Sequence, residues 1–235
     1  LTVQDVVSFT GSAATAAKLK THAVITRESI RFVAEQDSLN ASVLGPDATP
    51  DSPEFDLFIK EVAKEMTAKA GQKCTAIRRA LVPARLLDAA QAALIARLEK
   101  TTIGDPRDEA TRMGALVSVS QRQDVRDKIT EIARDGAIVY GDPSAAPVNE
   151  KGAFISPVLM RCEKPWEARA VRDVEAFGPV STLMPYKDAA DAIAVANRGK
   201  GSLVMSAFSY DTEFARELVL GSGAFHGRLA FIDRD

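Results

Sequence analysis

The sequence predicts an α/β protein whose mostly parallel sheet is flanked by helices. Three observations support this prediction. Short apolar runs alternate with helical stretches along most of the 235 residues, two of the helical stretches begin after well-placed serines, and 46% hydrophobic with 26% charged residues is a globular composition. Strands that alternate with helices are typical of βαβ units, which build parallel sheets. A chain of this length can bury a sizeable core in one large or two small domains.

The first predicted elements are a strand at Val6–Thr10 and an Ala-rich helix that follows Gly11. Ser12 is suited to the N-cap of this helix because its hydroxyl can accept a hydrogen bond from a free amide. Two further strands are expected at residues 30–34 and at Ala41–Leu44, separated by the polar stretch EQDSLN.

A longer helix is predicted to begin where serine precedes proline, at Ser52 and Pro53. Apolar residues then recur at helical spacing: Phe55, Phe58, Ile59, Val62, Ala63 and Met66. We expect this helix to end at Gly71, a residue type favoured just past a helix C-terminus. Cys74 would then lie in the loop before a strand over residues 77–82.

The remaining chain continues the alternation. We expect helices at about 85–99, 119–134, 187–197 and 211–220. We expect strands near 137–140, 154–159, 179–185, 203–208 and 228–232. Residues 141–152 form the most loop-like stretch, and the sequence has no internal repeat.

Charge and hydropathy exclude two classes of partner. The net charge of −2, from 30 basic and 32 acidic residues, gives no electrostatic reason to bind nucleic acid or an acidic membrane surface. The chain contains no run of 18 apolar residues, so we expect no transmembrane helix.

The N-terminal residues and the cysteines indicate the cellular context. LTVQDVVSFTGS has neither the basic region nor the apolar core of a signal peptide. The chain starts without methionine in an apolar segment, so we expect a segment from the middle of a longer protein. Two cysteines make no disulfide framework, which favours the cytoplasm.

No metal site is expected. The chain has only two histidines, His22 and His226, and neither has a second ligand at helical spacing. We place His22 on the surface and His226 in a turn before Gly227. Nothing in the sequence pairs either histidine with Cys74 for hydrolytic chemistry.

Two stretches near the N-terminus are candidates for a ligand site. In FTGS, a strand, a glycine and a helix start make a turn whose free amides can bind phosphate. Glu35 ends an apolar strand, and the carboxyl edge of a parallel sheet is where ligands bind. The alternatives are an ordinary αβ turn and a plain surface glutamate.

GQKCTAIRR holds the candidate nucleophile, Cys74. Lys73, Arg78 and Arg79 could lower the pKa of this thiol if their charged groups approach the sulfur. Alternation along a strand sends the two arginines to opposite faces, so we expect at most one of them near it. The alternative is a buried free cysteine that acts as a small hydrophobe, which is also how we interpret Cys162.

Together these stretches resemble the aldehyde dehydrogenase superfamily in order and spacing. VSFTGS resembles the strand, turn and helix that meet the cofactor diphosphate. Glu35 matches the glutamate that opens the family's Glu-Leu-Gly-Gly-Lys motif, and GQKC matches its Gly-Gln-x-Cys motif. MGALVS resembles the Met-Gly-Pro-Leu segment, VEAFGPV matches the Glu-x-Phe-Gly-Pro motif, and GSLVMSAFSYD and GRLAFID match the late strand-helix-strand part. The resemblance spans essentially the whole chain.

The resemblance implies roles for seven residues. Cys74 would be the nucleophile that forms a thiohemiacetal and then an acyl-cysteine, and Glu35 the general base that activates water. Contacts to the cofactor would come from Gly11, Ser12, Gln36, Glu175 and Phe177. The fold implied is aldehyde-dehydrogenase-like, with residues 1–37 ending the dinucleotide-binding domain and residues 38–235 forming the catalytic domain.

Departures from the family pattern suggest one branch. EQDSLN replaces Glu-Leu-Gly-Gly-Lys-Ser, Ala16 replaces a frequent glycine, and GRLAFID lacks the usual Trp-Val-Asn ending. These features resemble semialdehyde dehydrogenases that act on ring-opened CoA thioesters in bacterial aromatic degradation. That resemblance implies NADP as cofactor, with NAD possible, a CoA-bearing aldehyde as substrate, and a homodimer or larger homo-oligomer.

Three alternatives stay open. The chain could be a catalytically incomplete binding or assembly fragment, because the family's adenosine-binding strands and oxyanion-binding asparagine precede this segment. It could be another non-acylating aldehyde dehydrogenase. An acylating enzyme that passes the acyl group to CoA is less favoured, because Glu35 supplies the base that hydrolysis needs.

Overall fold

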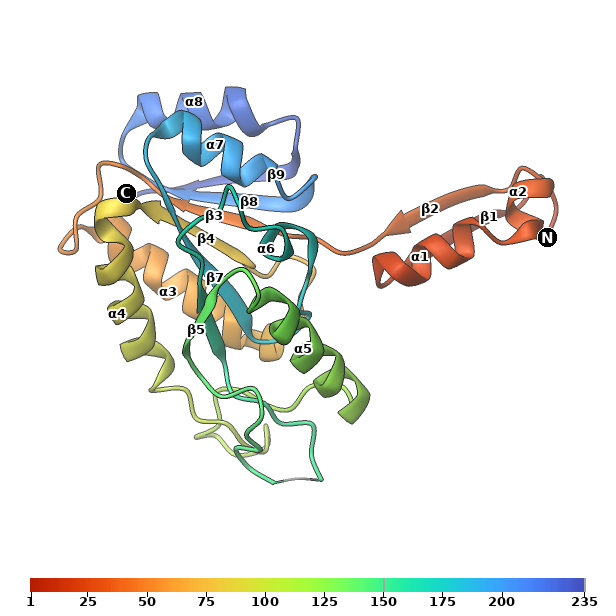
Figure 1. Ribbon diagram of the computed structural model, residues 1–235, viewed down its shortest axis with the longest axis horizontal. Helices are drawn as coiled ribbons and strands as arrows, with labels where there is room; N and C mark the ends of the chain where they lie inside the picture. The colour runs from red at the N-terminus through yellow and green to blue at the C-terminus, as the bar shows by residue number, and fades with distance from the viewer. Residues whose placement is uncertain (150, 235) are drawn as a thin grey trace. The chain divides into compact units, whose positions relative to one another are not determined.

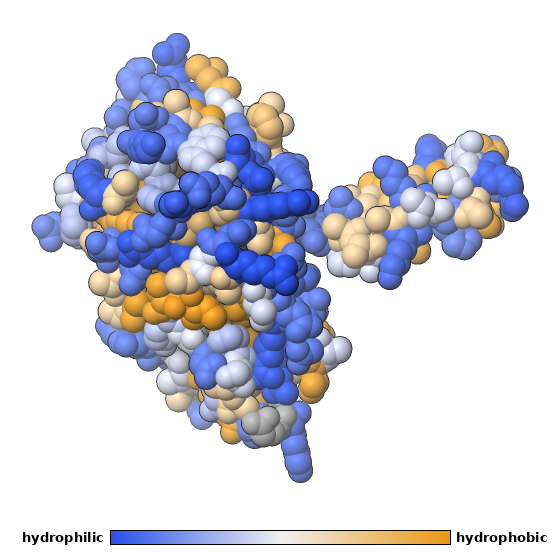
Figure 2. All heavy atoms as spheres, viewed as in Figure 1, coloured by the Kyte–Doolittle hydropathy of each residue, from blue (hydrophilic) through white to orange (hydrophobic). Residues whose placement is uncertain are grey.

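The computed structural model describes residues 1–149 and 151–234, and the chain divides into two compact units, Leu1–Ser38 and Leu39–Asp235 (Figure 1). Polar side chains cover much of the face of the larger unit drawn in Figure 2, with apolar residues gathered in a patch between them.

The smaller unit is a parallel two-stranded sheet with two helices in the crossover. Its elements are β1 (Val6–Thr10), α1 (Ala13–Lys20), α2 (Ala23–Arg27) and β2 (Arg31–Glu35). The Ser12 hydroxyl accepts a hydrogen bond from the Thr15 amide, so the predicted N-cap is confirmed. Helix α2 was not predicted: it is a short helix capped by Nδ1 of the exposed His22, and histidine is not among the preferred N-cap residues.

The larger unit is built on a seven-stranded sheet among its described residues, in the order β5-β6-β7-β4-β3-β8-β9. The strands are β3 (Ala41–Leu44), β4 (Arg79–Pro83), β5 (Ala137–Tyr140), β6 (Val158–Arg161), β7 (Val180–Tyr186), β8 (Ser202–Phe208) and β9 (His226–Ile232). Every neighbouring pair is parallel except β5 with β6, so the predicted mostly parallel sheet is confirmed.

Helices cover both faces of this sheet (Figure 1). They are α3 (Pro53–Thr67), α4 (Leu87–Leu98), α5 (Val119–Ile132), α6 (Ala170–Asp173), α7 (Ala189–Asn197) and α8 (Thr212–Ser222). Residues of α3 and α4 pack in one apolar cluster, and residues of α5, α7 and α8 pack in the other. Because both faces are covered, the central strands β3 and β4 are buried at every position, as expected for parallel sheets.

Three local predictions were wrong. Strand β6 begins at Val158 rather than at residue 154, because Pro157 has no amide to donate to a ladder. His226 is the buried first residue of β9 rather than part of a turn, since it pairs with Ser202 of β8. The third, the end of α3, bears on the candidate active site.

Helix α3 ends at Thr67, four residues before the predicted stop at Gly71. The chain enters left-handed backbone conformation earlier than expected, at Lys69 and Ala70, whose φ angles are 53° and 52°. The left-handed conformation costs a residue with a side chain about 1–2 kcal/mol. Sequence preference alone therefore predicts the turn at Gly71. This turn, over Ala68–Gly71, leads into the loop that contains Cys74.

Candidate active site

Cys74 lies in a tight loop at the amino end of β4, and it is exposed. Two backbone hydrogen bonds shape the loop, from the Lys73 amide to the Gly71 carbonyl at 2.9 Å and from the Ala76 amide to the Lys73 carbonyl at 3.1 Å. The alternative of a buried cysteine in a structural role is therefore wrong for Cys74. It fits Cys162, which is fully buried and whose thiol pKa is raised by burial.

The glycine before the loop is required by a close backbone approach. Gly71 has a φ of 67°, and a Cβ atom there would overlap the Gly178 carbonyl oxygen. No side chain fits beside that carbonyl, so a glycine at this position lets the Cys74 loop approach the segment that enters β7. The two segments are neighbours because β4 pairs with β7.

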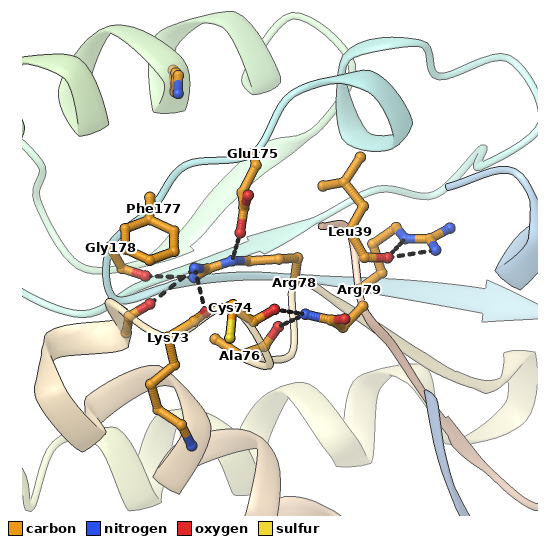
Figure 3. Close-up of polar contacts among 12 residues, drawn as sticks. Leu39, Lys73, Cys74, Ala76, Arg78, Arg79, Glu175, Phe177 and Gly178 are labelled. Atoms are coloured by element: carbon orange, nitrogen blue, oxygen red, sulfur yellow. Dashed lines mark hydrogen bonds and ion pairs between the residues drawn. The ribbon is translucent and has the colours of Figure 1, made fainter. Parts of the chain in front are cut away.

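Arg78 joins the Cys74 loop to that segment (Figure 3). Its Nε donates to Glu175 Oε1 at 3.0 Å, and its Nη1 donates to the Gly178 carbonyl at 2.7 Å. Its Nη2 donates to the Gly71 carbonyl at 2.9 Å, and the guanidinium lies 5.5 Å from the centre of the Phe177 ring. Burial lowers the pKa of Arg78, and the charge of Glu175 partly offsets this effect. Glu175 and Phe177, two predicted cofactor contacts, are thus held beside the loop of Cys74.

Arg79 extends in the opposite direction, as strand alternation predicts (Figure 3). Its guanidinium is buried and donates to three backbone carbonyls, those of Leu39, Val195 and Ala196. The last two belong to the final turn of α7, where the carbonyls also accept the amides of the residues that follow the helix and attract a cation. Burial lowers the pKa of Arg79 to about 10.

Lys73, the third cation of the motif, forms an ion pair with Glu65 of α3. The Lys73 side chain is 25% exposed, and that of Glu65 is 10% exposed. All three cations near Cys74 are therefore bound to other groups: Lys73 to a carboxylate, Arg78 to a carboxylate and carbonyls, and Arg79 to carbonyls.

In the smaller unit, Glu35 is the exposed last residue of β2. Its backbone carbonyl accepts a hydrogen bond from the Gly11 amide at 3.1 Å. The amide of Ala13, at the start of α1, donates to Asp37 Oδ1 at 2.9 Å. Sequence reasoning missed Asp37, which belongs to the EQDSLN stretch that departs from the family pattern.

Gln36, another predicted cofactor contact, lines a cavity of about 370 Å³ in the smaller unit. The other lining residues come from α1 and β2 and are mostly small or apolar: Ala13, Ala16, Ala17, Lys20, Phe32 and Ala34. The small side chains of α1 leave this cavity open along β2.

The structure therefore gathers the predicted site residues in two groups. Cys74, Glu175 and Phe177 lie together in the larger unit, and Gly11, Ser12, Glu35 and Gln36 lie together in the smaller one. Within residues 1–149 and 151–234, no group of three or more His, Cys, Asp or Glu side chains could hold a metal ion. Over the same residues, no helix is long and apolar enough to span a membrane.

Comparisons with known proteins identify the family of the chain. A family model described as "Aldehyde dehydrogenase family" matches residues 2–222. The chain is 47% identical over 233 residues to the 3,4-dehydroadipyl-CoA semialdehyde dehydrogenase of Aromatoleum evansii, covering 97% of this chain and 45% of that protein. It is 32% identical over 211 residues to a putative aldehyde dehydrogenase of Staphylococcus aureus strain MSSA476, covering 88% of this chain and 42% of that protein.

Solved structures show the same fold. The betaine aldehyde dehydrogenase of Staphylococcus aureus in complex with NAD+ superposes with a TM-score of 0.84 at 26% identity, covering 98% of this chain and 44% of that one. The chain thus spans less than half the length of the relatives it matches.

Proposed function

Because this chain belongs to the aldehyde dehydrogenase family, we propose that it carries the catalytic centre of an NADP-dependent semialdehyde dehydrogenase. The observation that carries the proposal is the exposed Cys74, whose loop is joined through Arg78 to Glu175 and Phe177. The substrate class, an aldehyde that bears a CoA thioester, rests on the relative from Aromatoleum evansii. We place this activity in the cytoplasm, in the degradation of aromatic compounds.

The proposal gives each unit a role. Residues 1–37, nearly all of the unit Leu1–Ser38, would end a dinucleotide-binding domain, and residues 38–235 would form the catalytic domain. The active protein is a homodimer or larger homo-oligomer.

Cys74 begins the reaction as a thiolate. Its sulfur attacks the aldehyde carbon, a C–S bond forms, and the carbonyl oxygen becomes the oxyanion of a thiohemiacetal. The Cys74 amide is the candidate donor to that oxyanion. Loss of hydride from the same carbon leaves an acyl-cysteine thioester.

Glu35 completes the reaction as a general base. Its carboxylate takes a proton from the water that attacks the thioester carbonyl, and the carboxylic acid leaves as the thiolate re-forms. Such assistance contributes about 10²–10⁴ in rate.

The dinucleotide, when bound, accepts the hydride; NADP is proposed, and NAD is the alternative. The start of α1 has suitable donor chemistry, because the Ala13 amide donates to an oxygen, Asp37 Oδ1, whose place a phosphate oxygen would take. Under the proposal, Gly11 and Ser12 would bind the diphosphate and Glu175 would bind the nicotinamide ribose. The remaining contacts are the Gln36 backbone, to the carboxamide, and Phe177, beside the ring.

Substitution of the nucleophile tests the proposal. Cys74→Ala, in the native polypeptide that carries this chain, should abolish NADPH formation with the aldehyde. Cys162→Ala is the matched control because Cys162 is buried in the core, and it should leave turnover intact. Most of the activity surviving in Cys74→Ala would refute the assignment.

The competing proposal is a non-catalytic binding or assembly unit; the chain spans less than half the length of each relative. Calorimetric titration of the chain with NADP and with NAD separates the two. Binding of either dinucleotide supports the enzymatic proposal, and binding of neither supports the assembly unit.

A further inference from the structure

Asn40 binds the Cys74 loop through its side chain. Its Nδ2 donates to two loop carbonyls, that of Cys74 at 2.8 Å and that of Ala76 at 2.9 Å. Its Oδ1 accepts the Val204 amide of β8 at 3.1 Å. Asn40 is 0% exposed, so its side-chain amide is shielded from water and depends on these partners.

The backbone of Asn40 binds the same loop. Its carbonyl accepts hydrogen bonds from the amides of Arg78 and Arg79, both at 3.1 Å. One residue therefore holds two carbonyls and two amides of the segment from Cys74 to Arg79. A fixed Cys74 carbonyl restricts the ψ angle of Cys74 and narrows the directions that its side chain can take.

The hydrogen-bonding pattern selects asparagine. The side chain must supply two N–H donors and one acceptor at short reach. Aspartate supplies no donor when ionised, and serine supplies only one. Glutamine has the groups but is one methylene longer.

We propose that Asn40 is a positioning residue that holds Cys74 in the orientation required for attack on the aldehyde. This inference rests on the proposed function, in which Cys74 is the nucleophile. Within the larger unit, Asn40 joins the start of the β3 segment, the Cys74 loop and β8 in one hydrogen-bonded group. The loop is thus fixed to the central strands of the sheet rather than to another surface loop.

Two substitutions test the donor role, one of which keeps the acceptor. Asn40→Asp keeps the acceptor for Val204 but places an oxygen against the carbonyls of Cys74 and Ala76, whereas Asn40→Ala removes the whole group. We expect both to lower the single-turnover rate of hydride transfer by about 10–100-fold, with KM for the dinucleotide changed by less than about 2-fold. The control is Asn197→Ala, which removes a similar bond, from Nδ2 to the Gly221 carbonyl rather than to the loop. It should leave the rate unchanged.

Hydrogen exchange gives a readout that does not depend on turnover. In both Asn40 variants, the amides of Arg78 and Arg79 should exchange at least about 10-fold faster than in the wild type. If either variant fails to fold, Asn40→Ser, which keeps one donor, is measured in its place. Wild-type hydride transfer in Asn40→Asp would overturn the inference, whether or not exchange changes. If Cys74→Ala stayed active, the proposed function would fail separately, and exchange would still decide whether Asn40 holds the loop.

Discussion

The buried ion pair between Arg78 and Glu175 allows a quantitative prediction. Arg78→Met removes a cation whose side chain is 4% exposed, from a carboxylate whose side chain is 5% exposed, 3.0 Å away. Methionine retains much of the aliphatic stem but none of the donors to Glu175, Gly178 and Gly71.

The expected loss is large because the carboxylate stays buried. Removing one partner of a buried pair costs about 3–5 kcal/mol in the free energy of unfolding. Replacing both partners by apolar residues is often nearly neutral, so Arg78→Met combined with Glu175→Leu should be less destabilised than Arg78→Met alone. The surface pair of Arg161 is the contrast, because its partners Asp88 and Glu163 are 88% and 62% exposed; Arg161→Met should cost less than about 1 kcal/mol.

Urea unfolding followed by circular dichroism measures the free energies of the wild type, the three single variants and the double variant under one condition. A cost below about 1 kcal/mol for Arg78→Met would refute the reasoning. So would a double variant as unstable as the sum of its two single substitutions, because the coupling between the charges would then be absent.

Two further predictions concern pH and the proposed base. Burial, with a smaller effect of Arg79, lowers the pKa of His226 to about 4, below the unfolded value near 6.5. His226 therefore contributes stability above pH 6.5 that is lost as pH falls toward 4, amounting to about 2 kcal/mol by pH 5. This pH dependence of the free energy of unfolding should be absent in His226→Phe but retained in His22→Asn. An equal pH dependence in the wild type and both variants would contradict the prediction. Glu35→Gln should give a burst of about one NADPH per site and then a slow steady state, and an unchanged steady state would remove Glu35 from the base role.

Local signals predicted most of the fold. Strands β1 and β3 have the expected bounds, and Ser12 and Ser52 cap α1 and α3, because strand pattern and N-caps depend on adjacent residues. The end of α3 was not predictable in this way, since Lys69 and Ala70 adopt left-handed conformation before Gly71, which itself lies against Gly178 of another strand connection.

The residues of the candidate site could be predicted from the sequence, but most of their contacts could not. Cys74 was expected in a loop past a helix, and its role as nucleophile stays a prediction. The pairing of Arg78 with Glu175 could not be read from the sequence, because it depends on β4 lying beside β7. Asn40 gave one signal, an amide at the start of an apolar strand, but its partners come from separate segments of the chain.

The anchors of the Cys74 loop also set an order of events during synthesis. Arg78 needs Glu175, Arg79 needs Val195, and Asn40 needs Val204, so the loop is held by residues that the ribosome adds long after the cysteine. Contacts so distant in sequence can form only after both segments have been synthesised, and closing the long loops between them slows folding. The Cys74 thiol therefore leaves the ribosome in a segment that lacks its native structure. It acquires its orientation only once most of the larger unit has been synthesised.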